Sequence, residues 1–415
     1  MKAVVSLNSG SSSIKFSLFA LDPQGQLMLS ATGKIDKIGI APSVRARTVD
    51  GTTLLEREWP DGTSLSHADL LTELFAWAAD HPLKDREIIA IGHRVVHGGA
   101  EFAAPRLVDA ALIGKLEDLC PLAPLHQPHN LAAIRAIAQL RPELPQVACF
   151  DTAFHHDKPV IASRFALPRA LHDQGIRRYG FHGLSYEYIA RRLAEIDPPL
   201  AAGRVIAAHL GNGASLCAMM AGRSIDTTMG FTALDGLMMG TRSGSLDPGV
   251  VLHLLTQMGM SAAEVEDLLY RKSGLLGVSG LSSDMRTLSA CEAPEAEEAM
   301  ALFAWRAGRE AGGLLSSLGG LDGIVFTAGI GENDAGIRSR ICRRLEWLGL
   351  RIDECANITN ATLISLPGSA VKAYIIPTDE ERMIALHTLS IVGRKRHEAP
   401  ARPYRQAGPR DRHCQ

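Results

Sequence analysis

Two similar turns of small residues lie about half a chain apart, and each one separates two short apolar runs. The first occupies residues 4–16 and contains Asn8-Ser9-Gly10-Ser11-Ser12-Ser13, and the second occupies residues 205–217 and contains Gly211-Asn212-Gly213. An apolar run, a tight turn and a second apolar run predict a β-hairpin. Two such hairpins at equivalent places favour a duplicated domain, and two ordinary surface hairpins are the alternative.

These turns are suited to holding phosphate groups, because their backbone N–H groups and hydroxyls can surround an anion. A third glycine turn, residues 328–333, follows the apolar run 323–327, and we expect a helix after it. The three turns predict a nucleotide phosphate chain in a cleft between two halves. The sequence has neither a G-x-x-x-x-G-K-[ST] loop nor the protein-kinase motif set, so ATP would be held by another design.

Composition narrows the class of protein. A chain of 415 residues is expected to form two or three domains. Its 43 Lys and Arg against 45 Asp and Glu argue against a general nucleic-acid binder. Seven cysteines, an odd number without a C-x-x-C pair, predict a reduced, cytoplasmic compartment. We expect neither secretion nor a membrane span, since no signal core and no apolar run of about 18 residues occurs.

The apolar periodicity predicts alternating strands and helices in both halves. Strands are expected at 2–8, 14–21, 27–33, 88–93 and 146–150, and then from 205 through the second hairpin, at 323–327 and at 373–377. Helices are expected at 66–80, 109–119, 130–140, 185–196, 296–318 and after 381. The basic segment 393–415, with few aliphatic residues, is predicted to be a disordered tail.

Two arginines occupy positions with little structural reason for a charge. Arg94 follows an apolar strand and precedes two glycines, and Arg242 lies in a glycine loop. Arginine in such places favours paired hydrogen bonds to a carboxylate or phosphate. A surface ion pair is the alternative for each.

The best carboxylate candidates are Asp151 and Glu380, which follow apolar strands in different halves. They could share one Mg²⁺ with phosphate oxygens and water, although Asp151 could instead cap a turn or helix. His182, between glycines, is expected to present an accessible imidazole. The chain has 15 histidines, but none lies in a zinc-binding spacing, which argues against a zinc site.

Ten segments in order along the chain together resemble the acetate kinase family, within the sugar kinase, Hsp70 and actin superfamily. They are residues 8–15, 93–99, 124–126, 150–155, 177–183, 209–215, 229–248, 284–286, 326–333 and 377–381. The resemblance implies an α/β fold of duplicated ribonuclease H-like (actin/Hsp70-type) domains with mixed central sheets and an interdomain cleft. The N-terminal domain would comprise residues 1–150 plus about 380–392, and the nucleotide-binding domain residues 151–379.

The resemblance also implies reversible transfer of the ATP γ-phosphoryl group to acetate, which gives acetyl phosphate and ADP. The catalytic residues would be Asp151, Arg94, Arg242, His182 and His126. Asn8 and Glu380 would serve Mg²⁺, with Mn²⁺ as a substitute, and the family forms homodimers. The nucleotide would contact Lys15, His209, Leu210, Gly211, Asn212, Gly213, Asp284, Met285, Arg286, Gly329, Ile330, Gly331, Glu332 and Asn333.

One departure from the family concerns the pocket for the acetate methyl group. The family usually has proline where this chain has Ala233, beside Val96, Leu125 and Phe181. A smaller side chain could admit one more methylene, so a propionate or butyrate kinase of the same family is the near alternative. An actin- or Hsp70-like ATPase is the more distant one. A histidine common in the family four positions after His182 is Tyr186 here.

Overall fold

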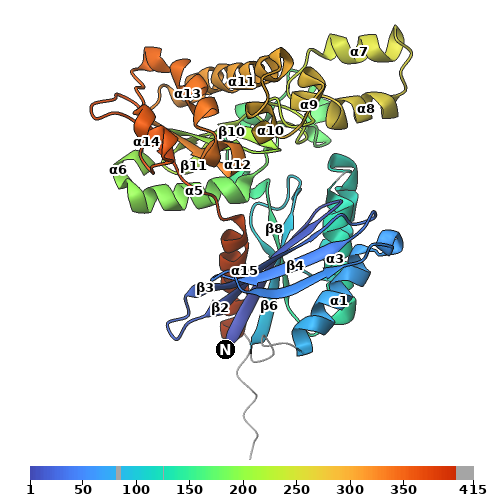
Figure 1. Cartoon of the computed structure of the whole chain (residues 1–415). Coiled ribbons are helices and arrows are strands. Elements are labelled where there is room, and N and C mark those ends of the chain that lie inside the picture. Colours follow the sequence, from blue (N-terminus) through green and yellow to red (C-terminus); the bar gives the residue numbers. More distant parts are fainter. Residues whose placement is uncertain (81–85, 125, 399–415) are drawn as a thin grey trace, which may run out of the picture.

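The computed structural model describes residues 1–80, 86–124 and 126–398, and Figure 1 shows them as two α/β domains that lie one above the other. The last helix, α15 (Glu380–Glu398), leaves the C-terminal domain and packs on the N-terminal sheet. The N-terminal domain is therefore built from both ends of the described chain.

The N-terminal sheet has the strand order β5-β4-β3-β2-β1-β6-β8-β7. β1 is antiparallel to β2 and parallel to β6, which in turn is parallel to β8. Its strands are β1 (Lys2–Ser9), β2 (Ile14–Leu21), β3 (Leu27–Asp36), β4 (Ser43–Thr48), β5 (Thr53–Glu58), β6 (Glu87–Val95), β7 (Arg106–Leu107) and β8 (Gln146–Phe150).

The C-terminal sheet has the order β11-β10-β9-β12-β13. β9 is antiparallel to β10 and parallel to β12, which is parallel to β13. Its strands are β9 (Arg204–Leu210), β10 (Ala214–Met220), β11 (Arg223–Thr227), β12 (Gly323–Thr327) and β13 (Lys372–Ile375).

The two sheets share one topology, since β3-β2-β1-β6-β8 and β11-β10-β9-β12-β13 have the same order and the same strand directions. The two glycine turns are the equivalent hairpins β1–β2 and β9–β10. The predicted duplication is therefore confirmed. In each sheet the carboxyl ends of the parallel strands meet at one edge, where α/β proteins place their ligands.

The α-helices fill the connections and cover the sheets. They are α1 (His67–Asp80), α2 (Ala110–Asp118), α3 (Gln127–Leu140), α4 (Arg169–Asp173), α5 (Gly183–Ile196), α6 (Pro198–Ala201), α7 (Pro248–Thr256), α8 (Ala262–Arg271), α9 (Gly274–Ser279), α10 (Met285–Ser289), α11 (Pro294–Leu318), α12 (Ala328–Asn333), α13 (Ala335–Arg343) and α14 (Glu354–Ile358). Short 3₁₀ turns are η1 (Gly62–Ser64), η3 (Cys120–Leu122), η4 (Ala153–His155), η5 (Val160–Ser163) and η6 (Glu346–Leu348).

Each sheet is buried on both faces over its parallel strands, so the central part of these strands is mostly apolar. Helices α1 and α3 cover one face of the N-terminal sheet, and α15 covers β1, β6 and β8 on the other. A side chain at Gly92 in β6 would collide with Ile384 of α15, so this glycine allows the helix to pack closely. In the C-terminal domain α5 covers one face and α11 the other.

Several expectations were wrong in detail. Residues 328–333, predicted as a turn, form α12, because Ala328 reverses the chain at φ +65° and Glu332 accepts a hydrogen bond from the Ala328 amide at 2.7 Å. The tail predicted from residue 393 starts too early, since α15 continues to Glu398; residues 399–415 lie outside the described part. Strands β4 and β5 were not predicted. No helix of the described residues is long and apolar enough to cross a membrane.

Candidate active site

A cavity of about 600 Å³ lies between the domains, where the carboxyl edges of the two sheets face each other. Fifteen of the predicted site residues line it: Asn8, Lys15, Arg94, Val96, His126, Asp151, Phe181, His182, His209, Gly211, Asn212, Gly213, Ala233, Arg242 and Gly329. Glu332 and Glu380 complete the predicted set found here. Residues from both ends and the middle of the chain thus converge on one cleft.

The N-terminal wall of the cavity holds a connected group of charges. Arg94 ends β6, Asp151 follows β8 and Asn8 lies at the end of β1, so three neighbouring strands place them together. The Arg94 guanidinium donates to Asp151 from Nε at 3.0 Å and from NH2 at 2.5 Å, and NH1 donates to Asn8 Oδ1 at 3.4 Å. Its Nε also lies 4.0 Å from Glu380.

The ion pair with Asp151 holds the Arg94 fork in place, so Asp151 is a positioning partner of the arginine in the free protein. The turn-cap alternative for Asp151 does not apply to its side chain, which accepts hydrogen bonds from Arg94. Burial, Asp151 and Glu381 together raise the pKa of Glu380 to about 7, although Arg94 opposes them.

Arg242 forms the opposite wall. Its NH1 donates to the Ala233 carbonyl at 3.0 Å, and no carboxylate within the described ranges pairs with it. Burial and the nearby Arg94 charge lower its pKa from the usual value. A half-buried arginine without an acidic partner is chemically suited to bind an anion.

His182 and Arg242 meet over the glycine turn of the second hairpin. A Cβ atom at Gly213 would lie 3.3 Å from His182 Nε2 and 3.9 Å from Arg242 NH1. A side chain at position 213 would therefore occupy the space that both donors face. This is the place in the cleft where two donors and a glycine turn converge.

His182 is buried, at 9% exposure, and not freely accessible as the flanking glycines suggested. It caps α5 in the left-handed region at φ +58° and stacks on His209, with ring centroids 4.1 Å apart. Burial lowers the pKa of His182 well below its usual range and that of His209 to about 3, so both rings are neutral. Burial and the two arginines also lower the pKa of His126 to about 4.

Not every predicted nucleotide residue lines the cavity. Leu210 packs into the core, and Ile330, Gly331 and Asn333 belong to α12 away from the lining. Asp284 caps α10 and pairs with the exposed Arg286, while Met285 is buried. The carboxylate of Glu332 accepts from the amides of Ala328 and Thr378 and so ties two strand ends together.

Comparison with known proteins shows which family this chain resembles. The sequence model of the Acetokinase family matches residues 3–386. The chain is 54% identical over 386 residues to an acetate kinase of Rhodopseudomonas palustris, covering 92% of this chain and 96% of the relative. It is 43% identical over 390 residues to an acetate kinase of Rickettsia felis, covering 93% and 98%. The chain belongs to the acetokinase family.

Solved structures agree with the fold of this acetokinase. A propionate kinase of Francisella tularensis superposes with a TM-score of 0.87 at 38% identity, covering 94% of this chain and all of the other. An acetate kinase of Porphyromonas gingivalis superposes with a TM-score of 0.83 at the same identity and coverage. The predicted fold class and the enzyme class are confirmed.

The predicted acyl pocket of the acetokinase lies between Arg94 and Arg242. Val96, Phe181 and Ala233 line the cavity there, and Leu125 lies outside the described residues. The Ala233 backbone also positions Arg242 through its carbonyl. Ala233 therefore lines the cavity and also contacts Arg242 through its backbone.

Five lining residues were not assigned to the site individually: Gly10, Ser13 and Ala328, which lie in the predicted phosphate-binding turns, and Thr378 and Glu381. Gly10 and Ser13 belong to the first hairpin, whose turn closes through a Gly10 amide bond to the Ser13 carbonyl at 2.8 Å. Thr378 and Glu381 flank Glu380. Each lies within two positions of a predicted site residue, and this proximity was the signal available.

A divalent cation fits the N-terminal wall of the acetokinase cleft. The donors there are oxygens of Asn8, Asp151 and Glu380, which suit Mg²⁺. The Asp151 and Glu381 carboxylates raise the pKa of Glu380, so a cation bound here would neutralise an excess of negative charge. No group of three or more ligating side chains occurs in the part of the chain that the structure describes, so phosphate oxygens and water would have to complete the coordination.

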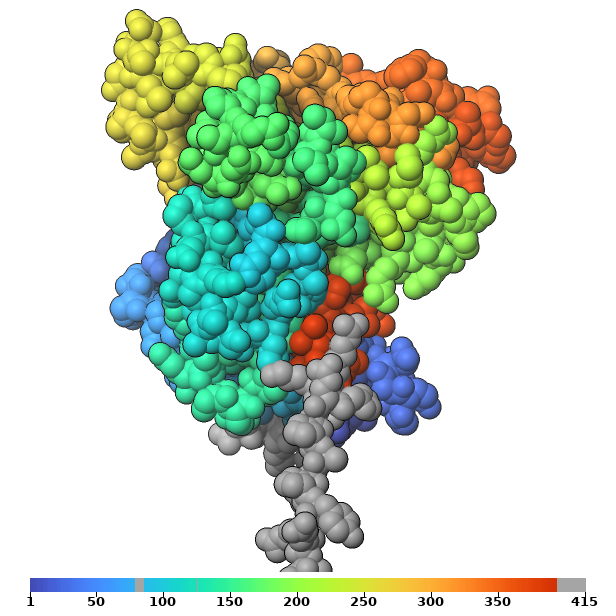
Figure 2. Space-filling model, turned by 180° about the vertical axis from the view of Figure 1, so that it is seen from behind, coloured from blue at the N-terminus to red at the C-terminus, as the bar shows by residue number. Residues whose placement is uncertain are grey.

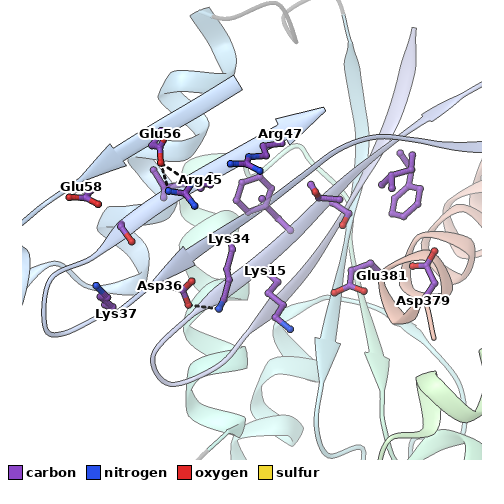
Figure 3. Close-up of a pocket in the computed structure, with 18 residues that line it drawn as sticks. Lys15, Lys34, Asp36, Lys37, Arg45, Arg47, Glu56, Glu58, Asp379 and Glu381 are labelled. Carbon is purple, nitrogen blue, oxygen red and sulfur yellow. Dashed lines mark hydrogen bonds and ion pairs between the residues drawn. The ribbon is translucent and has the colours of Figure 1, made fainter. Parts of the chain in front are cut away.

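A second hollow of about 760 Å³ lies on the open face of β2, β3 and β4, and Figure 3 shows its lining. Several of its charges are paired with one another, since Lys34 pairs with Asp36 along β3 and Arg45 of β4 pairs with Glu56 of β5. Lys15 and Glu381 line both hollows. The interdomain cavity, where unpaired donors converge, is the candidate active site.

Proposed function

We propose that this acetokinase transfers the γ-phosphoryl group of ATP to acetate, reversibly, and forms acetyl phosphate and ADP. The observation that carries the proposal is the convergence of Arg242 and neutral His182 on Gly213, opposite the Arg94–Asp151 pair. These groups can hold two anions close together in one cleft.

The chemistry needs little beyond alignment and neutralisation of charge. A carboxylic acid with a pKa near the roughly 4.3 of glutamate is already ionised at neutral pH and is its own nucleophile. The barrier lies in bringing a carboxylate to a phosphate and in stabilising charge on the phosphoryl oxygens. Arg94 would orient the acetate carboxylate. Arg242 and His182 would donate hydrogen bonds to the phosphoryl group as it is transferred.

The remaining lining residues suit the nucleotide. The turns at 10–13 and 211–213 offer backbone amides to the phosphates, and Lys15 adds a cation near them. Gly211, Asn212 and Gly329 form the side of the cleft nearest the C-terminal sheet. His209, Glu332 and the 284–286 segment would support this side, with Asp284 and Arg286 at its rim.

Asn8 and Glu380 would hold Mg²⁺, and when bound the cation would neutralise phosphate charge. Mn²⁺ has the same preference for oxygen ligands. Asp151 would keep Arg94 oriented beside it.

Propionate is the second candidate substrate. The smaller Ala233 leaves room for one more methylene, and such a difference is worth only about 1–3 kcal/mol of discrimination. The propionate kinase among the similar structures is consistent with a permissive pocket in this fold.

We also propose that the protein works as a homodimer in the cytoplasm. Helices α7 and α8 form an arm that projects from the C-terminal domain, and Figure 2 shows it from behind. No residue of α7 is buried, and Leu252 is 61% exposed beside the exposed Leu246 and Val250. This apolar face, here called the α7 patch, would pack against a second copy.

The cysteines of the described residues are free, which fits a reducing compartment.

Trapping of the product tests the function. The full chain is incubated with Mg-ATP, acetate and hydroxylamine, and acetyl hydroxamate is measured. Formation that needs both ATP and acetate is expected. ATP hydrolysis at a rate independent of the acid, without hydroxamate, would instead indicate an ATPase.

A further inference from the structure

A continuous hydrogen-bond relay leads from Tyr186 to the ring of His182. The Tyr186 hydroxyl lies 2.5 Å from Ser215 Oγ, which lies 2.8 Å from His182 Nδ1. Tyr186 and Ser215 are both fully buried, so water does not compete for these bonds. The relay crosses from α5 to β10 and returns to the residue that caps α5.

The relay permits an assignment in which each hydroxyl donates its proton towards His182. In it the Tyr186 phenol donates its proton to Ser215 Oγ, the hydroxyl that lies against it. Burial raises the pKa of Tyr186 well above its usual range, so the phenol keeps this proton. Ser215 then donates its own proton to His182 Nδ1, which must be the unprotonated nitrogen of a neutral ring.

The proton of His182 therefore sits on Nε2, the nitrogen that faces the cleft. Nε2 is the atom that a Cβ at Gly213 would approach to 3.3 Å, and Arg242 lies beside it. A hydrogen on Nε2 can be donated to an anion at this point, whereas a lone pair there would repel it.

We propose that Tyr186 is a positioning residue that fixes the proton of His182 on Nε2 through Ser215. The inference rests on the proposed role of His182 as a donor to the phosphoryl group. Orientation of a catalytic imidazole by a partner on its other nitrogen is a general device. Here the partner is a neutral serine hydroxyl, whose direction is in turn set by a tyrosine.

The neighbouring ring is held in a similar way. His209 Nδ1 lies 2.8 Å from Ser185 Oγ, which lies 2.9 Å from Thr378 Oγ1. The two stacked imidazoles are thus each anchored at Nδ1 by a serine. This second anchor limits rotation of the stacked rings. Tyr186 then determines which nitrogen of His182 carries the proton.

The test uses Tyr186→Phe in the full chain, with Tyr188→Phe as the matched control on the same helix outside the relay. ¹⁵N NMR of the histidine rings, with His182 assigned by comparison with His182→Ala, reports the tautomer. One lost hydrogen bond is expected to change the tautomer ratio about tenfold. We expect kcat to fall by about the same factor, with KM for acetate within about twofold. Ser215→Ala should change the tautomer ratio and kcat in the same direction as Tyr186→Phe does.

A Tyr186→Phe protein that keeps either the Nε2–H tautomer or the parental kcat overturns the proposal. Equal losses of activity and of melting temperature in Tyr186→Phe and Tyr188→Phe also overturn it, because they show a merely structural role. A fully active His182→Ala protein would refute the proposed donor role of His182, and the tautomer measurement distinguishes that outcome from failure of the relay.

Discussion

The imidazole of His182 stacks on that of His209, with ring centroids 4.1 Å apart and an angle of 17° between the planes. Burial keeps both rings neutral, because it lowers their pKa values below the usual range. This wall of the cleft therefore carries donors without net charge. The positive charge that faces an anion comes from Arg94 and Arg242, and the cleft can bind phosphate without burying an additional cation.

Buried neutral histidines predict acid sensitivity. Burial lowers the pKa of His93 to about 4 and that of His155 to about 3, against about 6.5 when unfolded. Between the folded and unfolded pKa values the unfolded chain binds more protons than the folded protein does. The free energy of unfolding therefore falls as pH falls. Each such histidine contributes about 1.4 kcal/mol per pH unit. Urea unfolding at pH 7.5 and 5.5 should show a lower midpoint at pH 5.5, and equal midpoints would contradict the account.

Glu380→Gln tests the cation site. The amide keeps the shape of the side chain but removes a charge from the group that contains Asn8 and Asp151. We expect the Mg²⁺ concentration for half-maximal activity to rise about tenfold or more, with KM for acetate little changed. Glu187→Gln, on α5 and paired with His387, is the control. An unchanged Mg²⁺ requirement in Glu380→Gln would show that the cation binds elsewhere.

Ala233→Pro tests the acyl pocket. The larger ring is expected to fill the space beside Val96 and Phe181 and to lower the propionate-to-acetate ratio of kcat/KM about tenfold. Ala233→Gly should raise the same ratio, since it enlarges the pocket. Ratios that are equal in the parent and both variants would show that residue 233 does not set the acid preference.

The α7 patch predicts the oligomeric state. Leu252→Asp places a charge in the proposed contact and is expected to convert the dimer to a monomer in light scattering after size-exclusion chromatography. The side chain is exposed, so the fold should be unaffected. Glu266→Lys on the neighbouring α8 serves as a charge-changing control. A Leu252→Asp protein that remains dimeric, or a monomeric parent, would contradict the proposed interface.

The sequence was most informative where a pattern was local. The hairpins at 9–14 and 210–214, and the strands that carry Arg94 and Asp151, follow from apolar runs that end in polar residues. The charged edge strands β4 and β5 lack such runs, and their pairing depends on β3. The burial of His182 was missed because Tyr186 and Ser215 come from separate elements, which only the tertiary fold brings together.

The central claim is that the donors above Gly213 stabilise phosphoryl transfer to a carboxylate. The most direct measurement is hydroxamate formation from Mg-ATP and acetate by Arg242→Ala, with Arg309→Ala, an exposed arginine on α11, as the matched control. Arginines of this kind are worth roughly 10³–10⁵ in rate, so we expect a loss of at least about 10³ in kcat with the fold retained. The control should lose far less. Near-parental kcat in a folded Arg242→Ala protein would contradict the account.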